Sequence, residues 1–163
     1  MPELPEVEAV ARALRPLVRG KRIRCVHLFH PIVTQPQPQS QFTRMVGRRR
    51  IQDVGRHGKY LFLELDRGLI EMHFRFDGQL IWFSNARELR NRANAGDRGV
   101  HVDVALEFSK GVLGFADGRH LGRVHAWESR EECKPLRQLG VDADSGKLRR
   151  GFSKKSCEPQ SEN

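Results

Sequence analysis

The fold is decided by the stretch YLFLELDRGLIEMHFRF at residues 60–76. Its two apolar runs, 60–65 and 69–76, flank the triplet 66–68. A turn-forming triplet between two runs of this kind predicts a β-hairpin. A second hairpin is predicted where the runs 101–108 and 112–116 flank residues 109–111. Further strands are predicted at residues 23–29, 50–54, 79–83 and 122–127. Seven or eight short strands are typical of a β-sandwich or flattened barrel.

A long amphipathic helix is predicted before the first strand. Apolar residues recur at spacings of three and four between Val7 and Val18, which is a helical period. Pro5 suits the first turn, where a missing N–H costs little, and Gly20 is placed to end the helix. Other segments are predicted as short helices at 40–46 and 131–139, a proline-rich loop at 31–38 and a mobile basic loop at 84–99. The fold class is therefore mainly β with flanking helices and a long N-terminal helix.

Composition narrows the class of protein. The 163 residues correspond to roughly one domain, since domains commonly run to about 100–200 residues. Basic residues outnumber acidic ones by 29 to 20, a net charge of +9, which points to a polyanionic partner such as nucleic acid or an acidic membrane surface. No apolar run reaches the ~18–20 residues of a membrane span, and the N-terminus lacks the apolar stretch of a signal peptide. We expect a cytoplasmic protein.

Cysteine usage excludes two further classes. Cys25, Cys133 and Cys157 are few and scattered, and no Cys-x-x-Cys pair occurs. A disulfide framework and a ribbon-type zinc site are therefore not expected, and no residue is assigned as a metal ligand.

The first residues are the strongest candidates for chemistry. Removal of the initiator methionine would give Pro2 a free secondary α-amine. At pH ~7.5 about a quarter of a typical α-amine is unprotonated, against about one lysine in a thousand. Such an amine is a ready nucleophile for an aldehyde-like carbon. Glu3 and Glu6 add two nearby carboxylates that suit acid–base work, although carboxylates at a helix N-terminus are also expected from the helix dipole.

Six motifs occur in a definite order. They are MPELPEVE at 1–8, GRHGKYL at 55–61, HFRFDG at 73–78, HVD at 101–103, DGRHLG at 117–122 and LGVD at 139–142. In this order and spacing they resemble the formamidopyrimidine-DNA glycosylase family, the bacterial base-excision enzymes that include endonuclease VIII. The resemblance covers roughly residues 1–143, and it implies both an activity and a set of site residues.

Four residues match the catalytic positions of that family. Pro2 matches the proline that attacks C1′ of the damaged nucleotide, displaces the base and holds a Schiff base to the sugar. Glu3 matches the glutamate that assists base removal and ring opening, and Glu6 matches a supporting glutamate that orients the site. Lys59 matches a hairpin lysine that contacts phosphate and assists β-elimination; the alternative for Lys59 is a solvated lysine at a strand end. These steps require no metal or redox cofactor.

The resemblance also implies DNA contacts. Arg119 matches the arginine that pairs with the base opposite a flipped-out lesion. Phe76 and Leu121 replace the methionine and phenylalanine that fill the resulting void; both are apolar wedges, with ordinary turn packing as the alternative. Arg75 replaces a family glycine, so we expect the turn at 73–78 to follow a different backbone path. Arg98 and Gly99 stand where the family often has a lysine–histidine pair whose histidine contacts phosphate, so that contact is missing and we expect Arg98 to supply a substitute charge.

The chain is predicted to divide into a catalytic domain at 1–130, a linker at 131–143 and a basic, disordered tail at 144–163. The excess charge is expected on one duplex-facing surface formed by 48–59, the basic loop and Arg119. Family members continue with a helix–two-turn–helix domain and a zinc finger, whose motifs this sequence lacks. The resemblance implies a monomeric bacterial glycosylase and abasic-site lyase that acts on oxidised purines in double-stranded DNA.

Two alternatives to this function remain. The chain could be a truncated, weakly active or inactive remnant that binds DNA nonspecifically; this reading shares Pro2, Glu3 and Lys59 with the enzyme. An unrelated basic β-domain that binds RNA or a membrane surface is the second alternative, and the same three residues argue against it.

Overall fold

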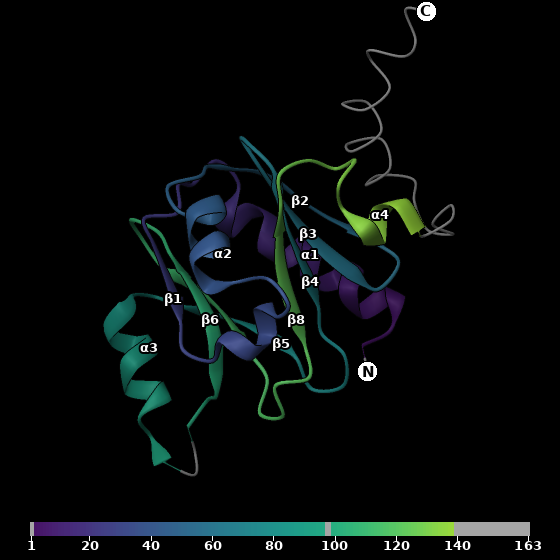
Figure 1. Ribbon diagram of the computed structural model, residues 1–163. Coiled ribbons are helices and arrows are strands. Elements are labelled where there is room, and N and C mark those ends of the chain that lie inside the picture. Colours follow the sequence, from purple (N-terminus) through teal and green to yellow (C-terminus); the bar gives the residue numbers. More distant parts are fainter. Residues whose placement is uncertain (1, 97–98, 139–163) are drawn as a thin grey trace, which may run out of the picture.

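Two four-stranded antiparallel sheets form the framework of the described residues, which are 2–96 and 99–138 of this computed structural model (Figure 1). The first sheet has the order β1 (Cys25–Leu28), β6 (Val102–Glu107), β7 (Val112–Ala116) and β5 (Gln79–Phe83). The second has the order β2 (Ile51–His57), β3 (Tyr60–Leu65), β4 (Leu69–His73) and β8 (Arg123–Trp127). The sheets do not close into a barrel, so the sandwich form of the prediction is confirmed.

Both predicted hairpins are present. In the first, β3 pairs with β4 so that Tyr60 lies opposite His73. In the second, β6 pairs with β7 and Leu106 lies opposite Leu113. The second pair contains a register shift between Val102 and Val104, so Asp103 lies in a β-bulge.

The main core lies between the two sheets and follows the alternation of side chains along each strand. Leu61 and Leu63 belong to this core, whereas Phe62 faces the outer side of the second sheet and packs against Cys133. The predicted linker is described as far as residue 138, and Cys133 within it is fully buried. Burial raises the pKa of the Cys133 thiol to about 12, so this thiol stays protonated at neutral pH.

Four α-helices flank the described part of the sandwich. They are α1 (Leu4–Val18), α2 (Gln39–Val46), α3 (Ala86–Ala93) and α4 (Lys134–Gln138). The long N-terminal helix is confirmed: α1 packs on β2 and β3, and buries Val7, Ala11, Leu14 and Val18. In Figure 1 α3 lies at the edge of the molecule beside the first sheet. No helix in the described ranges is long and apolar enough to cross a membrane.

The prediction of a mobile loop at 84–99 is wrong in part, because this segment contains α3. The side chain of Asn85 accepts a hydrogen bond from the Glu88 backbone N–H at 2.9 Å and so caps the helix. Leu89 is buried in the cluster on the outer face of the first sheet, and Arg92 lies over the ring of Phe83. The sequence analysis missed this helix because the arginine-rich composition drew attention away from the buried Leu89 and the capping residue Asn85. The proline-rich loop likewise contains a 3₁₀ turn, η1 (Pro31–Thr34).

Candidate functional site

Three segments of the chain meet at a small surface pocket. Its walls come from Pro2 before α1, from Lys59 in the β2–β3 turn, from His73 at the end of β4, and from Phe74 and Arg75, which follow that strand. The Nζ atom of Lys59 lies 3.2 Å from Oε2 of Glu3, which precedes α1. The fold therefore brings together Pro2, Glu3 and Lys59, three of the four residues proposed as catalytic. We call this site the N-terminal pocket.

The position of Lys59 follows from a tight turn. His57 pairs with Tyr60, so Gly58 and Lys59 form a two-residue hairpin loop. Gly58 has a φ of +59°, a conformation that glycine adopts without steric cost. The side chain of Lys59 is one-third exposed. This turn places the ammonium group against Glu3 and in the wall of the pocket.

Glu6 serves the helix start rather than the pocket wall. Its Oε2 accepts a hydrogen bond from the backbone N–H of Glu3 at 2.9 Å, as in a capping box. This contact fixes the backbone immediately after Pro2. The geometry agrees with the supporting role that the resemblance implied, and equally with the helix-start alternative.

A buried ion pair attaches α1 to the turn that carries Lys59. The Nε atom of Arg56 donates to Oε2 of Glu8 at 2.9 Å, and its Nη1 atom donates to the carbonyl of Gly58 at 3.1 Å. The Arg56 side chain is fully buried. Burial raises the pKa of Glu8, but hydrogen bonds and charge from Arg56 and Arg12 outweigh it, so this pKa lies below its ordinary value. Sequence reasoning missed this pair, although both residues lie inside the quoted motifs.

The expected basic surface at 48–59 does not form as one patch. Arg56 is buried, whereas Arg48 and Arg50 lie before the first residue of β2 and Lys59 follows its last residue. A seven-residue strand at about 3.3 Å per residue spans about 23 Å. Lys59 belongs to the N-terminal pocket, and Arg48 and Arg50 lie at the opposite end of the strand.

His73 is a pocket residue that the sequence analysis did not single out, although it begins the HFRFDG motif. Its Nδ1 accepts a hydrogen bond from the Arg75 backbone N–H at 3.2 Å, which leaves Nε2 as the protonated nitrogen of the neutral ring. Burial, together with the charges of Arg75 and Lys59, holds the pKa of His73 below its ordinary value. The pocket therefore contains a neutral imidazole beside two cations.

The turn after β4 accommodates an arginine where the family has glycine. Arg75 has a φ of +58°, the left-handed region that glycine favours. The turn thus has a glycine-like conformation at this residue despite the substitution. Phe76 follows it and is 56% exposed.

Arg119 lies next to this turn. Its guanidinium forms an ion pair with Asp77 and lies over the ring of Phe76 at 5.5 Å. The hydrogen bond from Arg119 holds the pKa of Asp77 below its ordinary value. Leu121 is 39% exposed. We call Phe76, Arg119 and Leu121 the wedge residues; Arg98, the remaining predicted contact, lies outside the described residues.

Asp117 shapes the loop at 117–122, here called the wedge loop. Its buried carboxylate accepts hydrogen bonds from the backbone N–H groups of Arg119, Leu121 and Gly122 at 3.0, 2.9 and 2.6 Å. A Cβ atom on Gly122 would lie 2.6 Å from the Phe115 ring, so only glycine fits there. The loop backbone is thus fixed while two wedge side chains project into solvent.

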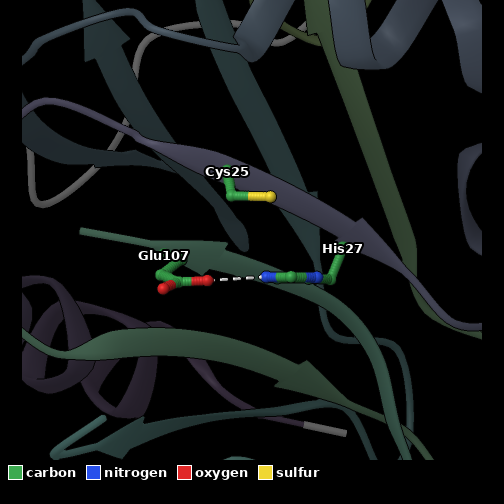
Figure 2. A group of neighbouring side chains, drawn as sticks. All are labelled: Cys25, His27 and Glu107. Carbon is green, nitrogen blue, oxygen red and sulfur yellow. Dashed lines mark hydrogen bonds and ion pairs between the residues drawn. The ribbon is translucent and has the colours of Figure 1, made fainter. Parts of the chain in front are cut away.

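Among the described residues, two groups of side chains have the composition of metal ligands, a feature that the sequence analysis did not predict. Cys25 and His27 on β1 lie beside Glu107 on β6, and His27 hydrogen-bonds Glu107 at 2.8 Å (Figure 2). The second group, His30, Asp103 and His120, lies at the wedge loop. In each group one potential ligand atom per residue lies within 4.8 Å of the others.

Comparison with known proteins agrees with this geometry. The family model for the formamidopyrimidine-DNA glycosylase N-terminal domain matches residues 1–124. A Bacillus licheniformis formamidopyrimidine-DNA glycosylase is 36% identical over 152 residues, which cover 91% of this chain and 52% of that protein. The Bacillus subtilis protein of the same name is 34% identical over 157 residues, covering 94% and 54%.

Solved structures show the same similarity. Lactococcus lactis Fpg in complex with abasic-site DNA aligns with a TM-score of 0.68 and 26% identity, over 80% of this chain and 45% of that one. The chain spans about half the length of the curated relatives it matches. Because the family model covers most of the sequence and the pocket unites its motifs, this chain belongs to the formamidopyrimidine-DNA glycosylase family.

Proposed function

We propose that this protein removes oxidised purines from double-stranded DNA and cleaves the resulting abasic site, using the α-amine of Pro2 after loss of Met1. The observation that supports this best is the N-terminal pocket, where Pro2, Lys59 and His73 meet and Glu3 lies 3.2 Å from Lys59. A nucleophile with adjacent acid–base groups is the arrangement that covalent catalysis needs. A cytoplasmic bacterial setting is part of this proposal.

The proposed reaction is balanced without an external oxidant. The Pro2 nitrogen forms a bond to C1′ as the bond from C1′ to the base breaks, and the base leaves with a proton. The ring bond from C1′ to O4′ then breaks, with O4′ taking a proton, and leaves an iminium between Pro2 and C1′. The iminium acidifies the C2′ hydrogen; a base removes it, and the C3′–oxygen bond breaks to release the phosphate. Glu3 and Lys59, in contact with each other, are the groups placed to move these protons.

The wedge residues suit the DNA side of this reaction. A base removed from the duplex leaves a void, and filling it offsets a few kcal/mol of unstacking. Phe76 is exposed beside Arg119, and its turn also supplies Arg75 to the N-terminal pocket. One short segment therefore links the proposed void-filling group to the proposed nucleophile.

Borohydride trapping tests the proposal directly. Wild type, Pro2→Gly and Arg12→Gln are incubated at low salt with duplexes that carry an abasic site or an oxidised guanine. We expect wild type and Arg12→Gln to form a reduced covalent adduct that peptide mapping assigns to residue 2. Arg12 is the control, because it lies on α1 outside the pocket and its side chain is 62% exposed.

The two substrates separate the two main hypotheses. An adduct with both duplexes supports a glycosylase with lyase activity. An adduct with the abasic duplex alone supports the weakly active remnant, which retains only the amine chemistry. No adduct with either duplex, or an adduct on a lysine instead of residue 2, would contradict the enzymatic proposal.

A further inference from the structure

We infer that His30, Asp103 and His120 form a binding site for a divalent transition-metal ion, with Zn²⁺ as the probe, and that the bound ion braces the wedge loop. The three residues come from three separate segments: the corner between β1 and η1, strand β6, and the wedge loop. Neutral imidazoles and a carboxylate are donors that zinc accepts.

Asp103 provides the central observation. Its side chain is fully buried, and Oδ1 makes a 2.6 Å hydrogen bond with Nδ1 of His120. The other carboxylate oxygen, Oδ2, is buried and has no hydrogen-bond partner in the described part of the chain. An unpartnered buried oxygen is costly, and a cation bound at this oxygen would remove that cost.

The backbone directs Asp103 toward the two histidines. Asp103 is the extra residue of the β-bulge in β6, and bulges re-aim side chains next to functional sites. Its carbonyl accepts hydrogen bonds from the N–H groups of Phe29 and His30 at 2.8 and 3.1 Å. These bonds hold the segment that carries His30 against the bulge.

The two imidazoles already lie together. The rings of His30 and His120 are 4.5 Å apart between centroids, and one potential ligand atom from each of the three residues lies within 4.8 Å of the others. Zinc–nitrogen bonds are about 2.0–2.1 Å long, so zinc binding would require the three side chains to converge on the ion. His120 has a φ of +54°, an unusual conformation for histidine. That conformation is held in the loop that Asp117 organises.

The Cys25–His27–Glu107 group is the weaker candidate (Figure 2). The two groups differ mainly in their carboxylates: that of Glu107 is one-third exposed, whereas that of Asp103 is fully buried. The other residues are exposed or partly exposed in both groups. A thiol, an imidazole and a carboxylate are available in the Cys25–His27–Glu107 group, so this group can compete for zinc in an experiment. Within the described ranges, however, it has no buried carboxylate oxygen without a partner, and it forms no hydrogen bond to the wedge loop.

A bound ion would connect the wedge loop to β6 and to the corner before η1. His120 lies between Arg119 and Leu121, two of the wedge residues. Metal binding would therefore reduce the local opening of this loop. This consequence concerns stability of the loop itself and does not depend on the proposed glycosylase activity.

Zinc titration calorimetry on the full chain, after treatment with chelator, tests the inference. All proteins carry Cys25→Ser and Cys157→Ser, which remove the exposed thiol and the thiol of the C-terminal segment. The test variants are His30→Gln and His120→Asn, because asparagine tolerates positive φ. The matched control is His27→Gln, the same change in the competing group.

We expect zinc binding in the parent and in His27→Gln, weakened at least about tenfold in His30→Gln and His120→Asn, since even outer-shell changes cost about 10–100-fold. Zinc should also slow amide exchange at residues 117–122 in the parent and in His27→Gln but not in His30→Gln. Absence of zinc binding in the parent, or equal loss in His27→Gln and His30→Gln, would overturn the site. Binding without slower exchange would overturn the bracing role.

Discussion

The N-terminal pocket and the wedge loop are held in place by different means. Beside the pocket, the buried Glu8–Arg56 pair attaches α1 to the β2–β3 turn, and the two partners are far apart in sequence. The wedge loop is organised by Asp117 within six consecutive residues, and Arg119 is held by an exposed pair with Asp77. This difference in anchoring matches two different requirements. The proposed catalytic groups require a fixed position, whereas side chains that enter DNA must be free to move.

Removal of Arg56 should have the largest effect on folding. Arg56→Met leaves the partly buried Glu8 without its buried partner, and loss of one member of such a pair costs about 3–5 kcal/mol. Urea denaturation should show this loss in the free energy of unfolding. Arg12→Gln removes the other, mostly exposed cation of Glu8 and should cost about 0.5 kcal/mol or less. Equal effects of the two substitutions would refute the idea that burial distinguishes them.

The second-largest loss of stability is expected from added side-chain volume in the rigid wedge loop. In Gly122→Ala the new methyl group would meet the Phe115 ring at 2.6 Å, and overpacking of this kind typically costs about 1–3 kcal/mol. Gly118 lies in the same loop, and a Cβ there would lie 3.9 Å from the nearest atom, on His101. Gly118→Ala should therefore leave the unfolding midpoint close to that of wild type. If the loop were flexible instead, both variants would have the same unfolding midpoint in this denaturation assay.

Two histidines should contribute to the free energy of unfolding with opposite dependences on pH. Burial and nearby cations lower the pKa of His73, so its contribution is present above pH ~6.5 and is lost as pH falls. Burial lowers the pKa of His125, but the Glu71 carboxylate 3.8 Å away and a hydrogen bond to the Gln35 carbonyl outweigh it and leave the pKa raised. That contribution is present below pH ~6.5 and is lost as pH rises.

Denaturation of His73→Gln and His125→Gln between pH 5 and 8 measures both contributions. Relative to wild type, His73→Gln should lose less stability on acidification, and His125→Gln should lose less on alkalinisation. A shared direction for the two variants would contradict the proton linkage in at least one of them.

Strand periodicity and ordered motifs were sufficient to predict much of this molecule. The hairpins, the sandwich and α1 follow from local alternation and from turn residues such as Gly68. The motif order also placed Pro2, Glu3 and Lys59 in one site. Helix α3 was missed because a single buried Leu89 among arginines gives little periodic signal.

Contacts between distant segments could not be read from the sequence. Arg56 looks like one more surface cation in a basic segment, and only the packing of α1 on β2 shows it buried against Glu8. His30, Asp103 and His120 lack any ligand-like spacing, because a bulge and a loop bring them together. The spacing of residues along the sequence reveals a metal site only where the ligands are close in sequence.

The smallest effect is expected at the exposed Asp77–Arg119 pair. Asp77→Asn should leave the unfolding midpoint unchanged, because solvent screens this pair. The same change frees the guanidinium of Arg119 and removes a negative charge beside it, so affinity for an abasic duplex at low salt should rise. Fluorescence anisotropy measures this affinity, with Arg119→Gln as the comparison that should lower it. If Asp77→Asn instead weakened DNA binding, the ion pair would be positioning Arg119 for the duplex, and the wedge residues would be as fixed as the N-terminal pocket.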